Sequence, residues 1–158
     1  MTPPKKQPRT TKKSVNLTPL SKYLVFTDKC LNRLFHIYEI NNGQKYDFCH
    51  CLDFPSNSDG VYIFIHENPH GIDDEKIRIM NWEGLYCGKT IDLRRRFTTH
   101  QRKDDLKDID NLHIAICYCS NRQEITQLEE YLLSKYKFPV NRKDNHGIKD
   151  AYFTDENV

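Results

Sequence analysis

No apolar run in this sequence approaches the length of a transmembrane helix, and its N-terminus lacks the apolar stretch of a signal peptide. Both absences argue against membrane insertion and secretion, so we expect a soluble, cytoplasmic protein without a membrane partner. The 158 residues suffice for one domain with a modest core and an extension.

Acidic residues are absent from the first 22 positions, which carry six basic ones: Lys5, Lys6, Arg9, Lys12, Lys13 and Lys22. The rest of the chain has 18 basic and 22 acidic residues, a net charge of −4. Because residues 1–22 also contain prolines and few apolar side chains, we expect a disordered basic tail. This tail is either solvated chain without a function or an arm that follows phosphates, in which case its binding would depend on salt.

The spacing typical of zinc sites is absent among the six cysteines, which are Cys30, Cys49, Cys51, Cys87, Cys117 and Cys119. The pairs 49/51 and 117/119 have one intervening residue, whereas zinc sites usually have two to four. In a strand, this spacing places both thiols on one face. Buried free cysteines are therefore favoured, and a thiol-based zinc or redox protein remains an alternative.

Hydrophobic periodicity predicts an α+β fold with the order β-β-α-β-α, preceded by a helix over 26–40. The helix rests on a stripe of Leu31, Leu34, Phe35 and Tyr38. Strands are expected over 61–65, 85–87 and 112–119, and helices over 92–103 and from Asn121 to about Lys137. We thus expect a small antiparallel three-stranded sheet flanked by helices, divided into a tail (1–22), an N-terminal helical arm (23–55), the main domain (56–145) and a loose C-terminal tail (146–158).

Two residues of the expected 92–103 helix stand out by their helical phase. His100 lies on the same side as Leu93 and Phe97, with Arg96 beside them, whereas Arg94 and Arg95 point away. An arginine at the edge of a core needs an anionic partner. Here the partner is either a phosphate undergoing transfer or a carboxylate of the domain in a structural salt bridge.

Glu129 falls within the apolar stripe of the last expected helix, which is formed by Ile125, Leu128, Leu132 and Tyr136. A carboxylate in such a stripe is costly unless it is paired or binds a metal. Mg²⁺ often uses only one or two protein carboxylates. Glu129 is therefore the candidate metal ligand, with a salt bridge to Arg96 as the structural alternative, while Glu130 points toward solvent.

Tyr62 and Tyr86 lie on the first two expected strands, where their phenols can converge on one pocket. A tyrosine with its normal pKa near 10 is a poor base at neutral pH, but a nearby cation or metal-bound water lowers that pKa. The alternative is that both are core aromatics.

These residues together resemble the active site of the GIY-YIG nuclease family. Gly60-Val61-Tyr62 resembles its first motif, and Tyr86-Cys87-Gly88 resembles its second, with cysteine in place of the middle isoleucine. The stretch from Lys89 to Leu93, then Arg96 and His100, and the interval from Glu129 to Asn141 also resemble the family pattern. The resemblance covers roughly residues 59–142.

The resemblance implies hydrolysis of a DNA phosphodiester bond with one divalent ion, Mg²⁺ or Mn²⁺, on Glu129. It further implies that Tyr62 acts as general base or positions the nucleophile, assisted by His100 and Lys89. Tyr86 would orient the phosphate or water, and Arg96 would stabilise the developing charge. Asn141 would brace the site by hydrogen bonds.

Basic residues gather near this expected site and predict a DNA-binding surface, or else a solvated helix face: Lys89, Arg94, Arg95, Arg102 and Lys103. No separate zinc finger, helix-turn-helix or helicase segment is recognisable. Sequence specificity would then come from the 67–83 insertion, the N-terminal arm, a homodimer or a partner protein. A non-catalytic nucleic-acid-binding module with the same fold is the alternative function.

Overall fold

The computed structural model describes residues 14–26, 31–44, 51, 52, 54, 59–68, 72, 73, 78, 79, 81–90, 106, 108–141 and 146–158. Within these residues no helix is both long and apolar enough to cross a membrane. The expected helix over 92–103 lies outside the described residues, which end at Thr90 before it and resume at Leu106 after it.

Strands dominate the described residues. They are β1 (Ser14–Val15), β2 (Leu17–Val25), β3 (Phe35–Ile40), β4 (Cys51–Leu52), β5 (Gly60–Glu67), β6 (Ile72–Asp73), β7 (Arg78–Ile79), β8 (Trp82–Lys89), β9 (His113–Tyr118), β10 (Tyr136–Lys137), β11 (Lys149–Asp150) and β12 (Tyr152–Asn157). A short 3₁₀ turn, η1, spans Asn41–Gly43, and the helix α3 spans Arg122–Lys135.

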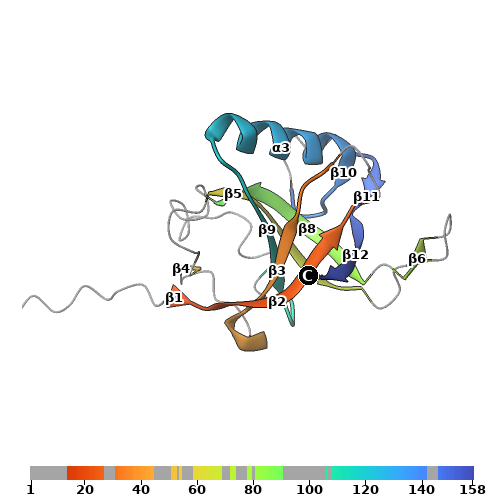
Figure 1. The fold of residues 1–158 in the computed structure, drawn as a ribbon. Helices are drawn as coiled ribbons and strands as arrows, with labels where there is room; N and C mark the ends of the chain where they lie inside the picture. The colour runs from red at the N-terminus through yellow and green to blue at the C-terminus, as the bar shows by residue number, and fades with distance from the viewer. Residues whose placement is uncertain are drawn as a thin grey trace, which may run out of the picture.

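Six of these strands form one antiparallel sheet that closes on itself in the order β12-β2-β3-β9-β5-β8 (Figure 1). β5 lies between β8 and β9, while β2 and β3 continue the sheet beyond β9. β12 completes the closure, because it pairs with β2 along most of its length and with β8 at Tyr152 and Phe153. Helix α3 packs across the sheet against β5 and β8.

Alternating side chains of β5 supply two separate apolar cores. Val61, Ile63 and Ile65 belong to the larger core, which α3 covers with Ile125, Leu128, Leu132 and Leu133. Tyr62 and Phe64 point to the opposite face and join a second core with residues of β8 and β9. Both faces of β5 are therefore buried, which explains why the strand reads as a continuous apolar run.

The prediction of a three-stranded sheet with an N-terminal helical arm is wrong, because strand β3 replaces the second half of the expected 26–40 helix. Leu34, a member of the expected helical stripe, is 58% exposed, whereas Phe35 and Ile37 are 0% and 1% exposed. The alternation of buried and more exposed side chains, typical of a strand, thus prevails over the helical spacing of the apolar residues. Pairing with β2 and β9 provides the tertiary context that a local pattern cannot reveal.

Both expected tails also contribute strands. Residues 14–22, placed in the basic tail by their composition, form β1 and most of β2, while residues 1–13 lie outside the described residues. Residues 149–157 form β11 and β12 rather than a loose tail. By contrast, the three strands expected in the main domain are present as β5, β8 and β9, and the last expected helix is present as α3.

Candidate active site

The β5–β8 hairpin places Tyr62 and Tyr86 on the same face of the sheet. Tyr62 lies opposite Gly88, and Tyr86 lies opposite Phe64. The two tyrosine ring centroids are 6.0 Å apart, and Tyr62 also meets Phe64 edge-on. Tyr62 is 1% exposed, whereas Tyr86 is half-buried.

Two glycines allow the close packing around these tyrosines. A Cβ atom at Gly88 would lie 2.7 Å from the Tyr62 hydroxyl oxygen and 2.9 Å from a ring carbon of Tyr86. A Cβ atom at Gly60 would lie 1.9 Å from the carbonyl oxygen of Cys117 on β9. Any side chain at either position would force the strands or the rings apart.

Thr90 ties the start of β5 to the end of β8. Its hydroxyl oxygen accepts a hydrogen bond from the backbone N–H of Gly60 at 2.9 Å, and the residue is fully buried. This bond fixes the hairpin at the end where both tyrosine motifs lie. Sequence reasoning assigned Thr90 no role, although a threonine directly after a strand is a frequent partner of nearby backbone groups.

Asn141 holds β8 from its outer edge. The Cys87 backbone N–H donates to Asn141 Oδ1 at 2.8 Å, and Asn141 Nδ2 donates to the Cys87 carbonyl at 2.9 Å. The neighbouring Val140 N–H donates to the Leu85 carbonyl at 2.9 Å. The amide side chain thus replaces a missing neighbour strand at this point.

Glu129 and Lys89 meet on the other face of β8, which α3 covers. The Lys89 Nζ and Glu129 Oε1 atoms are 3.7 Å apart, and the two side chains are 27% and 18% exposed. Glu130 is exposed, in agreement with the helical phase of the two acids. The Cys87 thiol shares this buried face, and burial together with the charge of Glu129 raises its pKa well above the ordinary value.

Helix α3, which carries Glu129, is anchored at its N-terminus. Asn121 is the N-cap, since its side chain accepts the Glu124 N–H at 2.8 Å. The Glu124 carboxylate accepts the Ser120 N–H at 3.2 Å and contacts the Arg33 guanidinium. Sequence reasoning missed Arg33 because it placed this residue in a helix of a separate arm.

Several predicted site residues lie outside the described residues: Arg94, Arg95, Arg96, His100, Arg102 and Lys103. Of the remaining ones, the structure brings Tyr62 together with Tyr86 on one face of the hairpin and Lys89 together with Glu129 on the other. The end of β8 at Gly88 and Lys89 lies between these two pairs, with Asn141 at its outer edge.

A single partly buried carboxylate, Glu129, fits the requirement of Mg²⁺, which retains several waters and needs few protein ligands. Among the described residues no group of three or more His, Cys, Asp or Glu side chains is arranged to enclose a metal.

Among the described side chains, Cys87, Cys117 and Cys119 belong to no group of three or more potential metal ligands. Cys87, Cys117 and Cys119 are free thiols. Burial is the main cause that raises the pKa of Cys117 to about 12, and it also raises the pKa of Cys119. Protonated thiols are poor nucleophiles at neutral pH.

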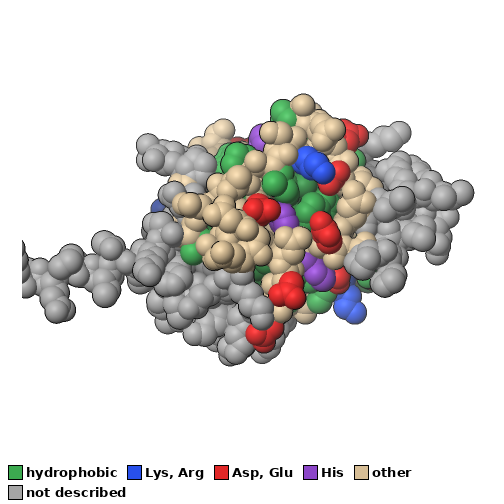
Figure 2. Space-filling view, turned by 90° about the horizontal axis from the view of Figure 1, so that it is seen from below, with side chains coloured by type: hydrophobic (Ala, Val, Ile, Leu, Met, Phe, Trp, Pro, Cys, Tyr) green, Lys and Arg blue, Asp and Glu red, His purple; other side chains and the backbone are tan. Residues whose placement is uncertain are grey.

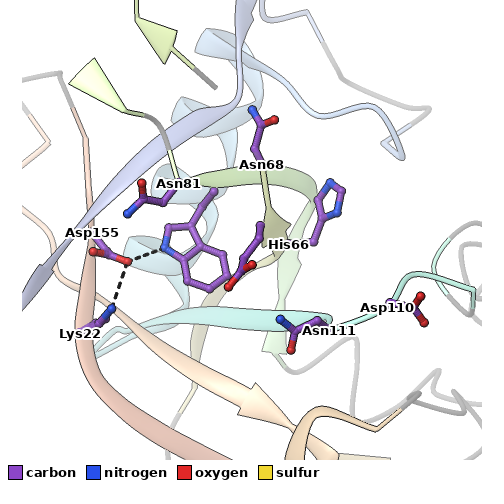
Figure 3. Close-up of a pocket in the computed structure, with 9 residues that line it drawn as sticks. Lys22, His66, Asn68, Asn81, Asp110, Asn111 and Asp155 are labelled. Carbon is purple, nitrogen blue, oxygen red and sulfur yellow. Dashed lines mark hydrogen bonds and ion pairs between the residues drawn. The ribbon is translucent and has the colours of Figure 1, made fainter. Parts of the chain in front are cut away.

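A hollow of about 510 Å³ opens at the opposite end of the hairpin, next to Trp82 (Figure 3). Asp155 accepts a hydrogen bond from Trp82 Nε1 at 2.8 Å and lies 3.7 Å from Lys22. The lining also includes Glu67, Asp110 and three asparagines. In the view from below, Asp and Glu side chains are spread over the described surface with few Lys or Arg side chains (Figure 2). DNA phosphates would be repelled from such a lining, so we do not place the nuclease chemistry there.

Comparison with known proteins supplies a family. A family model described as the GIY-YIG catalytic domain matches residues 58–144, more than half of the chain. The matched range contains β5, β8, β9, α3 and Asn141. Searches among curated proteins and among solved structures find no match.

Proposed function

The chain belongs to the GIY-YIG nuclease family, and on that premise we propose that it is a metal-dependent endonuclease that hydrolyses DNA phosphodiester bonds. The observation that carries the proposal is the arrangement around the end of β8. The paired tyrosines lie on one side of this strand end, and the Lys89–Glu129 pair lies on the other. We place the phosphate at this end, where a cation and a carboxylate lie on one side of the strand and the phenols on the other.

In this proposal Glu129 holds one Mg²⁺ or Mn²⁺ ion, which supplies charge stabilisation and an activated water when bound. The protein fixes the carboxylate by the rigid, capped helix α3 and by its packing on β8. Cys87 lies in the core that α3 covers, and Asn141 keeps the backbone of β8 in place.

Tyr86 is the tyrosine that a substrate can approach directly, since it is half-buried while Tyr62 is enclosed. We assign Tyr86 to orienting the phosphate or water. Tyr62 is assigned to positioning the nucleophile or accepting its proton, which requires water to reach its hydroxyl beside Gly88. His100 and Lys89 would assist, and Arg96 would stabilise the charge that develops on the phosphate.

DNA would be held by phosphate contacts from Lys89 and from four further basic residues, Arg94, Arg95, Arg102 and Lys103. Such contacts release counterions, so binding should weaken steeply with salt. The acidic lining of the hollow beside Trp82 favours an orientation in which that end points away from the duplex.

The test is incubation of the purified protein with supercoiled plasmid in the presence of Mg²⁺, Mn²⁺ or EDTA, beside the variants Glu129→Gln and Glu130→Gln. We expect metal-dependent nicking or linearisation that is lost in Glu129→Gln and kept in Glu130→Gln. The two variants are a matched pair, because they remove the same charge from adjacent positions of α3, one half-buried and one exposed.

Discrete product bands would additionally indicate a preferred sequence. Absence of cleavage by a well-folded wild-type protein that still binds DNA would instead favour a non-catalytic nucleic-acid-binding module. Equal loss of activity in both variants would remove the special role of Glu129.

A further inference from the structure

The Lys89–Glu129 ion pair joins two residues that the proposed function uses for different purposes. Lys89 ends β8, and Glu129 lies in the middle of α3. Their charged atoms are 3.7 Å apart, and both side chains are mostly shielded from solvent. The proposed metal ligand thus already has a cation beside it.

An ammonium group and a divalent ion cannot both use the same face of one carboxylate. The Lys89 ammonium partly neutralises the charge that would attract the metal, and it repels a second cation at short range. Partial burial makes both effects stronger than they would be between exposed side chains. A metal ion that binds Glu129 therefore has to displace the Lys89 ammonium group or bind in spite of its repulsion.

Lys89 is suited to moving away. A lysine carries a compact charge on a flexible four-carbon stem, so its ammonium can redirect without a fixed geometry. Its position directly after Gly88 places it at the strand end where we locate the DNA phosphate. A phosphate at that end offers Lys89 an alternative anion.

We propose that Lys89 acts as a removable counter-ion of Glu129, which weakens metal binding in the free protein and releases the carboxylate when a DNA phosphate takes over its charge. The inference rests on the proposed nuclease function, and it adds an energetic coupling between the binding of the metal ion and the binding of DNA. Because coupling between two binding sites is reciprocal, metal should also strengthen DNA binding.

The first experiment measures Mn²⁺ binding to the free protein by electron paramagnetic resonance, without DNA and without turnover. We expect Lys89→Met to bind Mn²⁺ about three- to tenfold more tightly than the wild type, because the variant lacks the ammonium group that pairs with Glu129. Lys89→Arg keeps the charge and should resemble the wild type. Lys137→Met is the matched control, because it removes one positive charge from an exposed residue of β10.

Thermal unfolding of each variant precedes the titrations, and Lys89→Gln replaces Lys89→Met if the latter does not fold. Glu129→Gln is measured in parallel. If Glu129→Gln weakens Mn²⁺ binding but Lys89→Met leaves it unchanged, the counter-ion role is overturned while the metal site stands. If Glu129→Gln binds Mn²⁺ as the wild type does, the metal site of the proposed function fails as well.

The second experiment measures the affinity of the protein for a labelled DNA duplex by fluorescence anisotropy. Each titration is made with and without Ca²⁺, which takes the place of Mg²⁺. We expect Ca²⁺ to raise the DNA affinity of the wild type by a larger factor than that of Lys89→Met. Equal factors for both proteins would overturn the coupling.

Discussion

At Gly88 the absence of a side chain lets the phenol of Tyr62 lie directly against the backbone of β8. The same space adjoins the ring of Tyr86, so a side chain at position 88 would meet both tyrosines. This is a close approach rather than a turn, because glycine at this position is needed for space and not for a left-handed backbone conformation.

We predict that Gly88→Ala destabilises the protein by about 1–3 kcal/mol, because the added methyl group overpacks a site already in contact. Displacement of the two tyrosines should lower plasmid cleavage by about a hundredfold, since small misplacements near reacting groups are costly. Thermal unfolding and cleavage assays of the same preparation check both effects.

The double variant Gly88→Ala/Tyr62→Phe separates the contact from other causes. It removes the hydroxyl oxygen, the atom closest to the new methyl group. The double variant should therefore regain part of the stability lost in Gly88→Ala. If the two substitutions are additive instead, the close contact is not what destabilises the single variant.

Among individual residues, local sequence patterns predicted the placement of some described side chains. The helical phase correctly directed Glu129 inward and Glu130 outward. The hydrogen bond from Gly60 to Thr90 and the Arg33–Glu124 contact could not be foreseen, because each joins segments whose relative position depends on the fold. The catalytic roles of the site residues remain predictions.

Among the strands, β8 carries both the second tyrosine motif and Lys89, yet only part of its outer edge is covered by another strand. β12 pairs with it at Trp82 and Glu83, and the Ala151 carbonyl accepts the Gly84 N–H. Beyond that point the chain at Val140 and Asn141 supplies the remaining bonds. The half of β8 nearest the proposed site therefore depends on Asn141.

We predict that Asn141→Ala costs about 1–3 kcal/mol of stability, because it leaves both the N–H and the C=O of Cys87 without their present partner. Cleavage should fall with little change in DNA affinity, since the side chain holds the strand. Asn141→Asp retains the acceptor for the Cys87 N–H but not the donor, and we expect an intermediate loss.

Chemical denaturation and anisotropy measurements compare these variants. Val140→Ala serves as a control, because it keeps the backbone N–H that bonds to the Leu85 carbonyl. A loss of DNA affinity as large as the loss of cleavage would contradict the bracing role of Asn141.

The elements that sequence patterns predicted are those formed by uninterrupted local signals, namely β5, β8, β9 and α3. β3 was misread because Leu31, Leu34, Phe35 and Tyr38 satisfy a helical spacing, and only the exposure of Leu34 shows that alternation governs the segment. β12 was missed because its sequence is rich in polar and charged residues. β2 was missed because it contains Pro19 and its first residues were assigned to the basic tail. Their register is set by partners far away in the chain.

At the scale of the whole molecule, the range that matches the family does not contain the full core. Residues 58–144 lack β2, β3 and β12, which supply core residues from both chain ends: Leu24, Phe35, Ile37 and Phe153. Removing these strands would expose the free edge of β9 and part of the edge of β8.

We therefore predict that the isolated fragment 58–144 shows no cooperative thermal transition and aggregates, whereas the whole chain unfolds cooperatively. A chain of residues 14–158 is the matched control, because it keeps every described strand and should unfold like the whole chain. Circular dichroism melts check the prediction. A folded fragment 58–144 that cleaves plasmid would refute it.

The pairing of β2 with β12 also determines how the protein responds to mechanical force. Lys22 pairs with Asn157, and the Val158 N–H donates to the Ser21 carbonyl, so β12 ends beside the middle of β2, on the side from which the chain enters that strand. A pull on the two ends would load these hydrogen bonds one after another, as in opening a zipper, rather than all together. Tension would first separate β12 from β2 and then from β8. The closed sheet would therefore open beside the β5–β8 hairpin before α3 is disturbed.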